Sequence, residues 1–556
     1  MRRAGGVASF FASVALALGL AAAPAPALAS EFPDVQGHWA ETTGVIDRAV
    51  EAGIMGGYSD GTFGPDDSVS RAQVAAILWR SAGSPEADAP DFPDCDYSET
   101  SFYGDAVEWA RAEGVIGGYA DGTFGPADPI TREQLAKVLA SYHAAQGGDI
   151  TSDADRLLRY SDGAGISDFA EQGVSWCVEN GIMGDSATLN PRGGATRAEA
   201  AKMVLAFIDG GTERPALLKA HFLDVGQGDS CFVELPNGQT MLVDAGTAPY
   251  GQRVVDYVRG AGYGSIDYVV MTHPDADHIG GMARVISSLP VGQIFAPACG
   301  STTQTWENLL DTIAAKGMTI TTATAGTSVV QTGELSVRFV APVSIVEGET
   351  NENSAVTWID YGGKTYYLTG DADASDLAAV APGHADVLKV SHHGSNTGTS
   401  LALLNRVTPS NAVISVGADN SYGHPTQAVL AMLYASGSNV YRTDQQGDVS
   451  SYSDTDAVWF SASPTSQPDP TPDPDPAPVP DPDPTPDPDP TPVPDPDPDP
   501  TPDPGPDMSM TVYVTRTGEK YHLDGCRHLS RSKIPTTLGE AKARGYEPCG
   551  TCNPPA

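Results

Sequence analysis

The sequence predicts a multidomain protein in which an all-α repeat region precedes an α/β domain and a small C-terminal module. Three observations support this prediction. A unit of about 60 residues recurs through residues 30–210. Strand-like and helix-like runs alternate through residues 217–462, and Pro alternates with Asp, Thr and Val through residues 464–507. A chain of 556 residues has room for roughly two to four domains, and residues 510–556 form the last of them.

Residues 1–29 have the three parts of a secretory signal peptide. Arg2 and Arg3 supply the charged region, an apolar run extends from Phe10 to Ala23, and Ala27-Leu28-Ala29 is a small-x-small cleavage site. The apolar run is short for a membrane-spanning helix. We therefore expect a secreted protein whose mature chain has no transmembrane segment.

The formal net charge of −40 is concentrated in part in one segment, because residues 464–507 contain twelve aspartates. This composition excludes a broad basic face of the kind that binds DNA passively. A segment of alternating Pro and Asp cannot form a core, so it is expected to be a disordered, extended linker whose charges repel one another.

The repeats occupy about residues 32–83, 92–147 and 160–208, and each ends in the same helix-start signal. This signal is a Ser or Thr followed three residues later by Gln or Glu, which is a capping box. It occurs at Ser70, Thr131 and Thr196. The first two repeats also share an Asp-Gly-Thr-Phe turn, which the third lacks. Each repeat should therefore be helix, glycine-rich loop, helix, and must stack on its neighbours to bury a core.

These repeats resemble S-layer homology modules through their Phe-Pro-Asp, Gly-Gly-Tyr-x-Asp-Gly-Thr-Phe and Ser/Thr-Arg-x-Gln/Glu elements. The resemblance implies a three-fold helical prism that binds a pyruvylated secondary cell-wall polysaccharide and attaches the protein to the cell wall or S-layer of a bacterium. Arg71, Arg132 and Arg197 match the basic position of the family and are the expected polymer-binding residues. The alternative is that these arginines only form ion pairs inside the prism.

A cluster of metal-capable side chains follows the apolar, strand-like run at residues 266–271. His273, Asp275, Asp277 and His278 lie within six residues, on what should be a tight loop at the end of the strand. Imidazole suits zinc, manganese and iron, whereas carboxylates favour harder ions such as manganese. The loop could therefore hold two ions close together, an arrangement that activates water and clamps a phosphate.

Residues 217–462 resemble a metallo-β-lactamase-fold hydrolase and, more narrowly, the catalytic domain of the ComEC DNA-uptake family. Six motifs appear in order: HFLDVGQGDS, LVDAG, THPDADHIGG, YLTGD, LKVSHHGS and YGHP. The resemblance implies an αββα sandwich with a metal site at one edge of two sheets. It also implies hydrolysis of phosphodiesters, with DNA as the expected substrate.

The same resemblance assigns metal ligands. His273, Asp275, Asp277 and His278 match the signature loop, Asp371 matches the carboxylate that bridges two ions, and either His393 or His424 completes the second ion's shell. The superfamily usually has a histidine where Asp275 stands and another between the loop and Asp371. This chain has neither, which favours manganese or a mixed site over two tightly bound zinc ions, with Asn353 and Ser354 available to fill the gap.

The expected reaction begins with a hydroxide formed from water that bridges the two divalent ions, zinc or manganese. Asp277 orients the water, while Lys389 or His392 offsets charge on the phosphate oxygens. Asp229 and Asp244 are expected to support the ligand loops. Two alternatives remain open: hydrolysis of another ester, of lactone or phosphocholine type, and a catalytically inactive surface binding protein.

The C-terminal module carries a second metal-ligand pattern, His-x3-Cys followed by Cys-x2-Cys. This spacing suits a closed tetrahedral zinc site made of His522, Cys526, Cys549 and Cys552. The module resembles the small Ada-like metal-binding tails of some secreted nucleases, and its lysines and arginines could guide nucleic acid to the enzyme. The alternative is a disulfide among these cysteines in an oxidising exterior.

Overall fold

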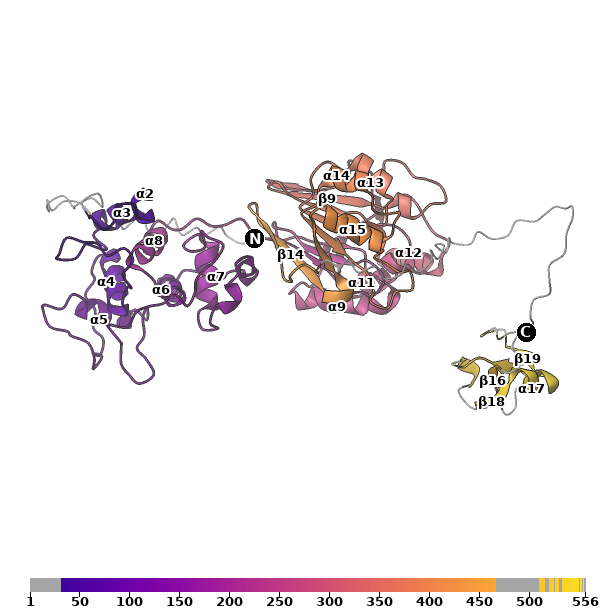
Figure 1. Ribbon diagram of the computed structural model, residues 1–556, viewed down its shortest axis with the longest axis horizontal. Helices are drawn as coiled ribbons and strands as arrows, with labels where there is room; N and C mark the ends of the chain where they lie inside the picture. The colour runs from indigo at the N-terminus through magenta and orange to yellow at the C-terminus, as the bar shows by residue number, and fades with distance from the viewer. Residues whose placement is uncertain are drawn as a thin grey trace. The chain divides into compact units, whose positions relative to one another are not determined.

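The computed structural model describes residues 32–466 and, near the C-terminus, residues 510–515, 520–524, 526–529, 533–549, 551–552 and 554 (Figure 1). The predicted signal peptide (1–29) and nearly all of the predicted linker (464–507) lie outside the described residues. The chain divides into two compact units, Met1–Asp475 and Pro476–Ala556. Within the described part of the chain, no helix has both the length and the apolar character needed to cross a membrane.

The repeat region is all-α, as predicted. Each of its three longest helices begins directly after a capping box in which the N-cap hydroxyl and the N3 side chain exchange hydrogen bonds with backbone amides; the N-caps are Ser70, Thr131 and Thr196. The helices are α2 (Trp39–Thr42), α3 (Val45–Glu51), α4 (Arg71–Ser81), α5 (Gly104–Ala112), α6 (Arg132–Ala145), α7 (Glu171–Glu179) and α8 (Arg197–Ile208), with a 3-10 helix, η2, at Ala154–Arg159.

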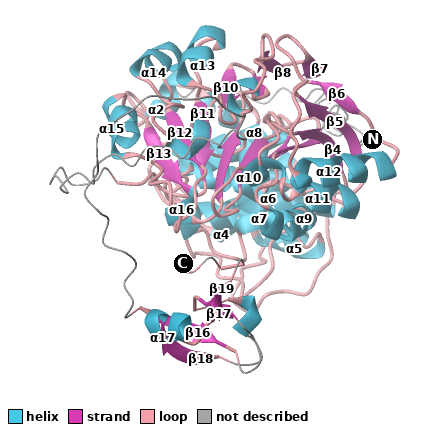
Figure 2. Ribbon diagram, turned by 90° about the vertical axis from the view of Figure 1, so that its right-hand side faces the viewer, coloured by secondary structure: helices cyan, strands magenta, loops and turns pink. Residues whose placement is uncertain are grey.

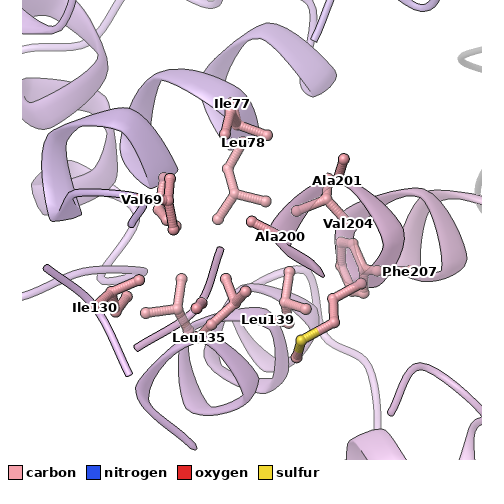
Figure 3. Close-up of a cluster of buried hydrophobic side chains, with 14 of the residues drawn as sticks. Val69, Ile77, Leu78, Ile130, Leu135, Leu139, Ala200, Ala201, Val204 and Phe207 are labelled. Carbon is pink, nitrogen blue, oxygen red and sulfur yellow. The ribbon is translucent and has the colours of Figure 1, made fainter. Parts of the chain in front are cut away.

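The three capping-box helices share one apolar core. Figure 3 shows Leu78 of α4, Leu139 of α6 and Val204 of α8 pointing toward one another. All three side chains are fully buried. Short antiparallel β-bridges join the segments before these helices in a closed cycle, pairing Ser70 with Pro129, Thr131 with Gly194 and Ser68 with Thr196. One repeat alone could not bury this surface, so the three repeats depend on one another.

The central domain, residues 217–462, contains two mixed sheets. The first has the strand order β15-β14-β1-β2-β3-β4-β5-β6 and the second has the order β13-β12-β11-β10-β9-β8-β7. The strands are β1 (Leu218–Phe222), β2 (Cys231–Glu234), β3 (Thr240–Val243), β4 (Ile266–Val270), β5 (Val291–Ala296), β6 (Ile320–Thr322), β7 (Ser328–Thr332), β8 (Leu335–Ala341), β9 (Val356–Tyr361), β10 (Lys364–Leu368), β11 (Val387–Lys389), β12 (Asn411–Ile414), β13 (Asn439–Arg442), β14 (Val449–Ser453) and β15 (Val458–Phe460).

Alternation along the strands builds the layers. Tyr366 and Leu368 of β10 face the other sheet, whereas Tyr367 between them faces the outer helices. One group of helices covers the second sheet and another covers the first, as Figure 2 shows for α13–α15 and for α9, α11 and α12. This arrangement confirms the predicted αββα sandwich. The helices are α9 (Gly251–Gly260), α10 (Ala276–Ile279), α11 (Met282–Ser288), α12 (Gln304–Ala315), α13 (Ala374–Val380), α14 (Leu401–Val407), α15 (Gln427–Ala435) and α16 (Thr443–Gln446).

Parallel pairing places several strand ends at one edge of the sandwich. In the first sheet β3 and β4 are parallel, and in the second sheet β10, β11 and β12 are parallel. The loops that leave the carboxyl ends of parallel strands meet at one sheet edge, which is where α/β proteins usually place their ligands. The predicted signature loop follows β4 at this edge.

The C-terminal unit has a four-stranded sheet of order β18-β16-β17-β19 and one short helix. Its strands are β16 (Thr511–Val514), β17 (Lys520–His522), β18 (Ile534–Thr537) and β19 (Glu547–Pro548), and its helix is α17 (Leu538–Ala543). Val512, Tyr521 and Leu538 form a small buried core. A core of this size needs an additional cross-link to hold the module folded.

Candidate metal centre

The ends of four strands deliver the side chains of the candidate site. Asp244 directly follows β3, and His273 comes three residues after β4. Asp371 and His393 follow β10 and β11 of the second sheet. Asp277 and His278 lie on α10, the single helical turn after His273. Residues from both sheets therefore converge on one site at the edge of the sandwich.

Each of the three buried histidines has its Nδ1 held by an oxygen. His278 Nδ1 lies 2.8 Å from Asp244 Oδ2, and His393 Nδ1 lies 2.9 Å from the Ser415 carbonyl oxygen. His273 Nδ1 lies 3.1 Å from Thr272 Oγ1, whose own hydroxyl donates to Asp244. Such partners keep the proton on Nδ1 and leave the Nε2 lone pair for a metal ion.

The Nε2 atoms face two carboxylates. His278 Nε2 is 3.2 Å and His393 Nε2 is 3.5 Å from Asp371 Oδ2, and His393 Nε2 is 3.2 Å from Asp277 Oδ2. Three groups that share His278 each have one donor atom per residue within 4.8 Å of the others. They are His273, His278 and Asp371; Asp277, His278 and His393; and Asp229, Asp244 and His278. Asp371 is near all three histidines, as the bridging position requires.

The donor set fits divalent cations. His273 Nε2, His278 Nε2 and Asp371 Oδ1 are buried and have no hydrogen-bond partner. A buried polar atom without a partner is costly, and such atoms are uncommon in folded proteins. A mixture of imidazole and carboxylate donors is the usual ligand set for zinc, manganese and iron. These residues are therefore arranged for metal ions that satisfy the open donor atoms.

Burial and neighbouring charges both shift the pKa values of the cluster. Burial and the neighbouring His278 lower the pKa of His273 to about 3, so this imidazole is neutral and ready to bind a cation. Burial alone would lower the pKa of His393, but Asp371 and Asp229 raise it to about 10. Burial raises the pKa of Asp371, yet the histidines outweigh it and hold this pKa well below its usual value.

A buried lysine–aspartate pair lies beneath the cluster. Lys389 is 4 % exposed, and its Nζ contacts Asp229 Oδ2 and lies 4.0 Å from Asp371 Oδ1. The second oxygen of Asp229 is 3.3 Å from His393 Nδ1. The Lys389 ammonium is thus directed at the carboxylates from the inner side. In this position its charge lowers the pKa of Asp229. The support that Asp229 gives to the ligand loop remains a prediction.

Backbone conformation also concentrates strain here. Asp244, His392 and His393 have φ values of 59°, 50° and 52°, in the left-handed region that non-glycine residues seldom occupy. A non-glycine residue in this conformation costs on the order of 1–3 kcal/mol, and clusters of such residues are typical of functional sites. Gly228 packs so closely that a Cβ atom there would lie 2.3 Å from the Asp277 carbonyl oxygen. The conformation of the signature loop therefore depends on its neighbours.

The remaining predicted residues lie around this cluster. Asp275 is 41 % exposed at its side chain, with Oδ2 3.7 Å from His273 Nε2. His392 Nε2 is 3.9 Å from Asp371 Oδ2. His424 is not part of the close groups, and its ring centroid is 5.8 Å from that of His392. Ser354 Oγ is 3.5 Å from His273 Nδ1.

One contributor had no signal in the sequence, and one residue named as a possible ligand has another role. The Ser415 carbonyl orients His393, but a backbone oxygen leaves no mark on residue identity. Asn353 was a candidate ligand, yet its amide donates to the Val346 carbonyl and accepts from the Val346 amide, so it fixes the neighbouring loop. Between the two histidine candidates for the second ion, the structure brings His393 to the carboxylates.

The three repeat arginines connect neighbouring repeats. Arg71 Nε and Nη2 donate to the carbonyls of Phe124 and Gly117 in the second repeat. Arg132 Nε donates to Leu189 O of the third repeat, and its Nη1 pairs with Glu199 at 2.8 Å. Arg197 Nε and Nη2 donate to Phe63 O and Gly56 O of the first repeat. Their contribution to polymer binding remains a prediction. Their hydrogen bonds to the neighbouring repeats close the ring of three repeats.

The C-terminal unit gathers its four predicted ligands. His522, Cys526, Cys549 and Cys552 have donor atoms that all lie within 4.8 Å of one another. His522 Nδ1 is 3.3 Å from Cys526 Sγ and 3.9 Å from Cys552 Sγ. All seven cysteines of the chain are unpaired, so the structure has the cluster and not the alternative disulfide. A His and three Cys at this spacing fit a tetrahedral zinc ion.

Comparison with known proteins agrees with this geometry. Residues 31–75, 96–136 and 159–201 match the S-layer homology domain, and residues 223–418 match the metallo-β-lactamase superfamily. ComE operon protein 3 of Bacillus subtilis is 31% identical over 248 residues, which are 41% of this chain and 32% of that protein. Recombination protein 2 of Haemophilus influenzae is 30% identical over 234 residues, which are 41% of this chain and 28% of that protein.

The repeats have their own relatives. S-layer protein EA1 of Bacillus anthracis is 32% identical over 188 residues, which are 33% of this chain and 20% of that protein. The chain spans about a third or less of the length of the curated relatives it matches. Both resemblances in the sequence are confirmed. The chain therefore combines N-terminal S-layer homology repeats with a metallo-β-lactamase superfamily domain that is homologous to ComEC-type competence proteins.

Proposed function

We propose that the central domain is a metal-dependent phosphodiesterase that cleaves DNA. The observation that carries this proposal is the convergence of three histidine Nε2 atoms on Asp277 and Asp371, with the Nδ1 atom of each histidine held by an oxygen. The homology to competence proteins adds support. Divalent ions held by these residues would lower the pKa of water and offset charge on a phosphate.

The chain's own residues have distinct roles in this proposal. His273, His278 and Asp371 would hold one ion, and Asp277, His393 and Asp371 would hold the other. Asp277 Oδ2 would also accept a hydrogen bond from a water molecule at the site and so orient it. His392, whose side chain is 26% exposed, donates from Nε2 to a phosphate oxygen. Lys389 affects the site through its contacts with Asp229 and Asp371, and it does not contact the phosphate.

The flanking parts of the chain suit an enzyme attached to the bacterial surface. The repeats belong to the S-layer homology domains, so we assign them the attachment to cell-wall polysaccharide through the loops near Arg71, Arg132 and Arg197. We also assign a structural zinc ion to His522, Cys526, Cys549 and Cys552. A small module with few buried apolar residues gains most of its stability from such an ion.

The test is cleavage of single-stranded and double-stranded DNA by the mature protein in manganese or zinc. Asp277→Asn should reduce the rate at least about 100-fold, because even loss of a ligand's hydrogen-bond partner commonly costs 10- to 100-fold. Asp311→Asn is the matched control, since Asp311 is exposed on α12, outside the metal-binding groups. It should retain the activity of the unmodified protein.

Two outcomes would contradict the proposal. Cleavage that survives in Asp277→Asn would show that another site, or a contaminant, is responsible. Absence of cleavage by a folded protein that holds its metal ions would exclude DNA as substrate and favour another ester, of lactone or phosphocholine type. A protein that binds no metal at the central domain would favour a surface binding role.

A further inference from the structure

A row of aromatic rings leads from the metal centre to the surface. His278 and His393 have ring centroids 5.4 Å apart, and His392 follows at 6.2 Å from His393. His424 is 5.8 Å from His392, and Tyr422 stacks on His424 at 5.9 Å with an interplanar angle of 24°. The row begins with buried ligands and ends with Tyr422, which is 56% exposed.

The loop that carries Tyr422 is held in place by one side chain. Asn420 Oδ1 accepts hydrogen bonds from the amides of Tyr422 and His424, at 3.2 and 3.1 Å. Its Nδ2 donates to the carbonyls of Gly417 and His424, both at 2.8 Å. Tyr422 is therefore an exposed ring on a preorganised loop. Little conformational entropy of the loop is therefore lost when a ligand stacks there.

We propose that Tyr422 is a stacking platform for an unpaired nucleobase beside the scissile phosphate. This inference rests on the proposed phosphodiesterase function and narrows its substrate to single-stranded or locally unpaired DNA. Exposed aromatic rings bind single-stranded nucleic acid by stacking, without sequence preference. A base inside a duplex has both faces covered by its neighbours, so it has no free face for Tyr422.

The charge distribution agrees with recognition through bases. The chain has a formal charge of −40, so long-range attraction of a polyanion is weak. The cation that lies against the metal-binding residues, Lys389, is already paired with Asp229. Stacking provides affinity that does not require free cations. It also gives a role to the exposed ring at the outer end of this row.

The test compares Tyr422→Ala with Tyr422→Phe on two single-stranded substrates of equal length, a normal oligodeoxynucleotide and one made of abasic sites. Tyr422→Ala should raise KM for the normal oligonucleotide about 5- to 150-fold, with kcat changed less than about twofold. It should leave KM for the abasic substrate unchanged. Tyr422→Phe keeps the ring and should match the unmodified protein on both substrates.

A binding measurement separates this inference from the proposed function. Fluorescence anisotropy of a labelled oligonucleotide, measured in the Asp277→Asn background, reports binding without cleavage. If the unmodified protein cleaves nothing but Tyr422→Ala still weakens binding by the expected factor, the proposed activity fails and the stacking site stands. Unchanged binding and KM in Tyr422→Ala would overturn the stacking site, as would an equal loss of kcat on both substrates, which indicates damage to the metal centre.

Discussion

Asp244 determines which nitrogen of His278 faces the metal centre. Its carboxylate is fully buried and accepts hydrogen bonds from His278 Nδ1, from the Thr272 amide and from the Thr272 hydroxyl. Replacing one oxygen by an amide nitrogen would present a donor to Nδ1–H and would turn the ring or change its tautomer. The residue is thus as important for metal binding as a direct ligand.

We therefore expect Asp244→Asn to weaken metal binding by the central domain about 10- to 100-fold. Competition with a chromophoric chelator measures this affinity directly and does not depend on catalysis. Asp256→Asn, which changes an exposed carboxylate on α9, should leave the affinity unaltered. An unaltered affinity in Asp244→Asn itself would mean that the Nδ1 hydrogen bond does not orient the ring.

At the residue scale, the sequence predicted which candidate ligands of one loop lie together, and it left open those that depend on distant backbone. His273, Asp277 and His278 are close because they lie within one turn of chain. The choice between His393 and His424 depends on the left-handed conformation of His392 and His393, which a sequence pattern does not reveal. The inward direction of Lys389 depends on Asp229, 160 residues earlier in the chain.

At the scale of elements, an aspartate at the start of each repeat holds the loop of the same repeat. Asp94 accepts hydrogen bonds from the amides of Phe124 and Gly125, both at 2.8 Å. Asp34 and Asp162 make the corresponding bonds in the other two repeats. Burial raises the pKa of Asp94, but these amides lower it by more, so the net pKa lies below the usual value of 3.8.

The sign of the pH dependence follows from that shift. A lowered pKa in the folded state stabilises the fold above pH 3.8, and this contribution is lost as the pH falls through the lower folded-state value. We expect Asp94→Asn to lower the thermal midpoint of the repeats at pH 7, with the difference from the unmodified protein shrinking toward zero as the pH falls below 3.8. Asp91→Asn, which removes a nearby exposed charge, is the control. If the thermal midpoint of Asp94→Asn stays below that of the unmodified protein at low pH, the hydrogen bonds of Asp94 do not depend on its ionisation.

Local signals explain why element boundaries in the repeats and the sandwich were predictable. A capping box sets a helix start through contacts three residues apart, so Ser70, Thr131 and Thr196 are correct N-caps. Strands such as β9 and β10 are apolar runs bounded by turns. The four-stranded sheet of the C-terminal unit was not predicted, because its strands are only two to four residues long and carry little periodicity.

At the scale of the whole molecule, buried charges join the 3-10 helix η2, which precedes the third repeat, to the central domain. Arg156, 1% exposed, donates to Asp454 Oδ2 at 2.9 Å, and Arg159 donates to the same atom at 3.1 Å. Asp454 Oδ1 accepts from the amides of Asp456 and Ala457. Since Arg156 and Asp454 are 298 residues apart, no sequence pattern indicated this contact.

Asp454→Ala should destabilise the protein by roughly 1–3 kcal/mol, because it leaves the buried Nη1 of Arg156 without an acceptor. The Nε of Arg156 keeps its ion pair with Glu179 at 3.2 Å. Urea unfolding followed by tryptophan fluorescence measures the change, and Trp459 reports on the joint because its Nε1 donates to Asp155 O. Asp456→Ala, an exposed neighbour, should cost far less. Equal midpoints for the two variants would show that the repeats and the central domain are not coupled.

The cyclic closure of the repeats also fixes the order in which they can be completed. Arg197 donates to the carbonyls of Phe63 and Gly56, which lie 134 and 141 residues earlier. Contacts across such distances form late, because the intervening chain must first be ordered. The first repeat therefore cannot reach its final form while the ribosome still holds the third. The three repeats complete their folding together, after residue 197 has been synthesised, and not one by one during synthesis.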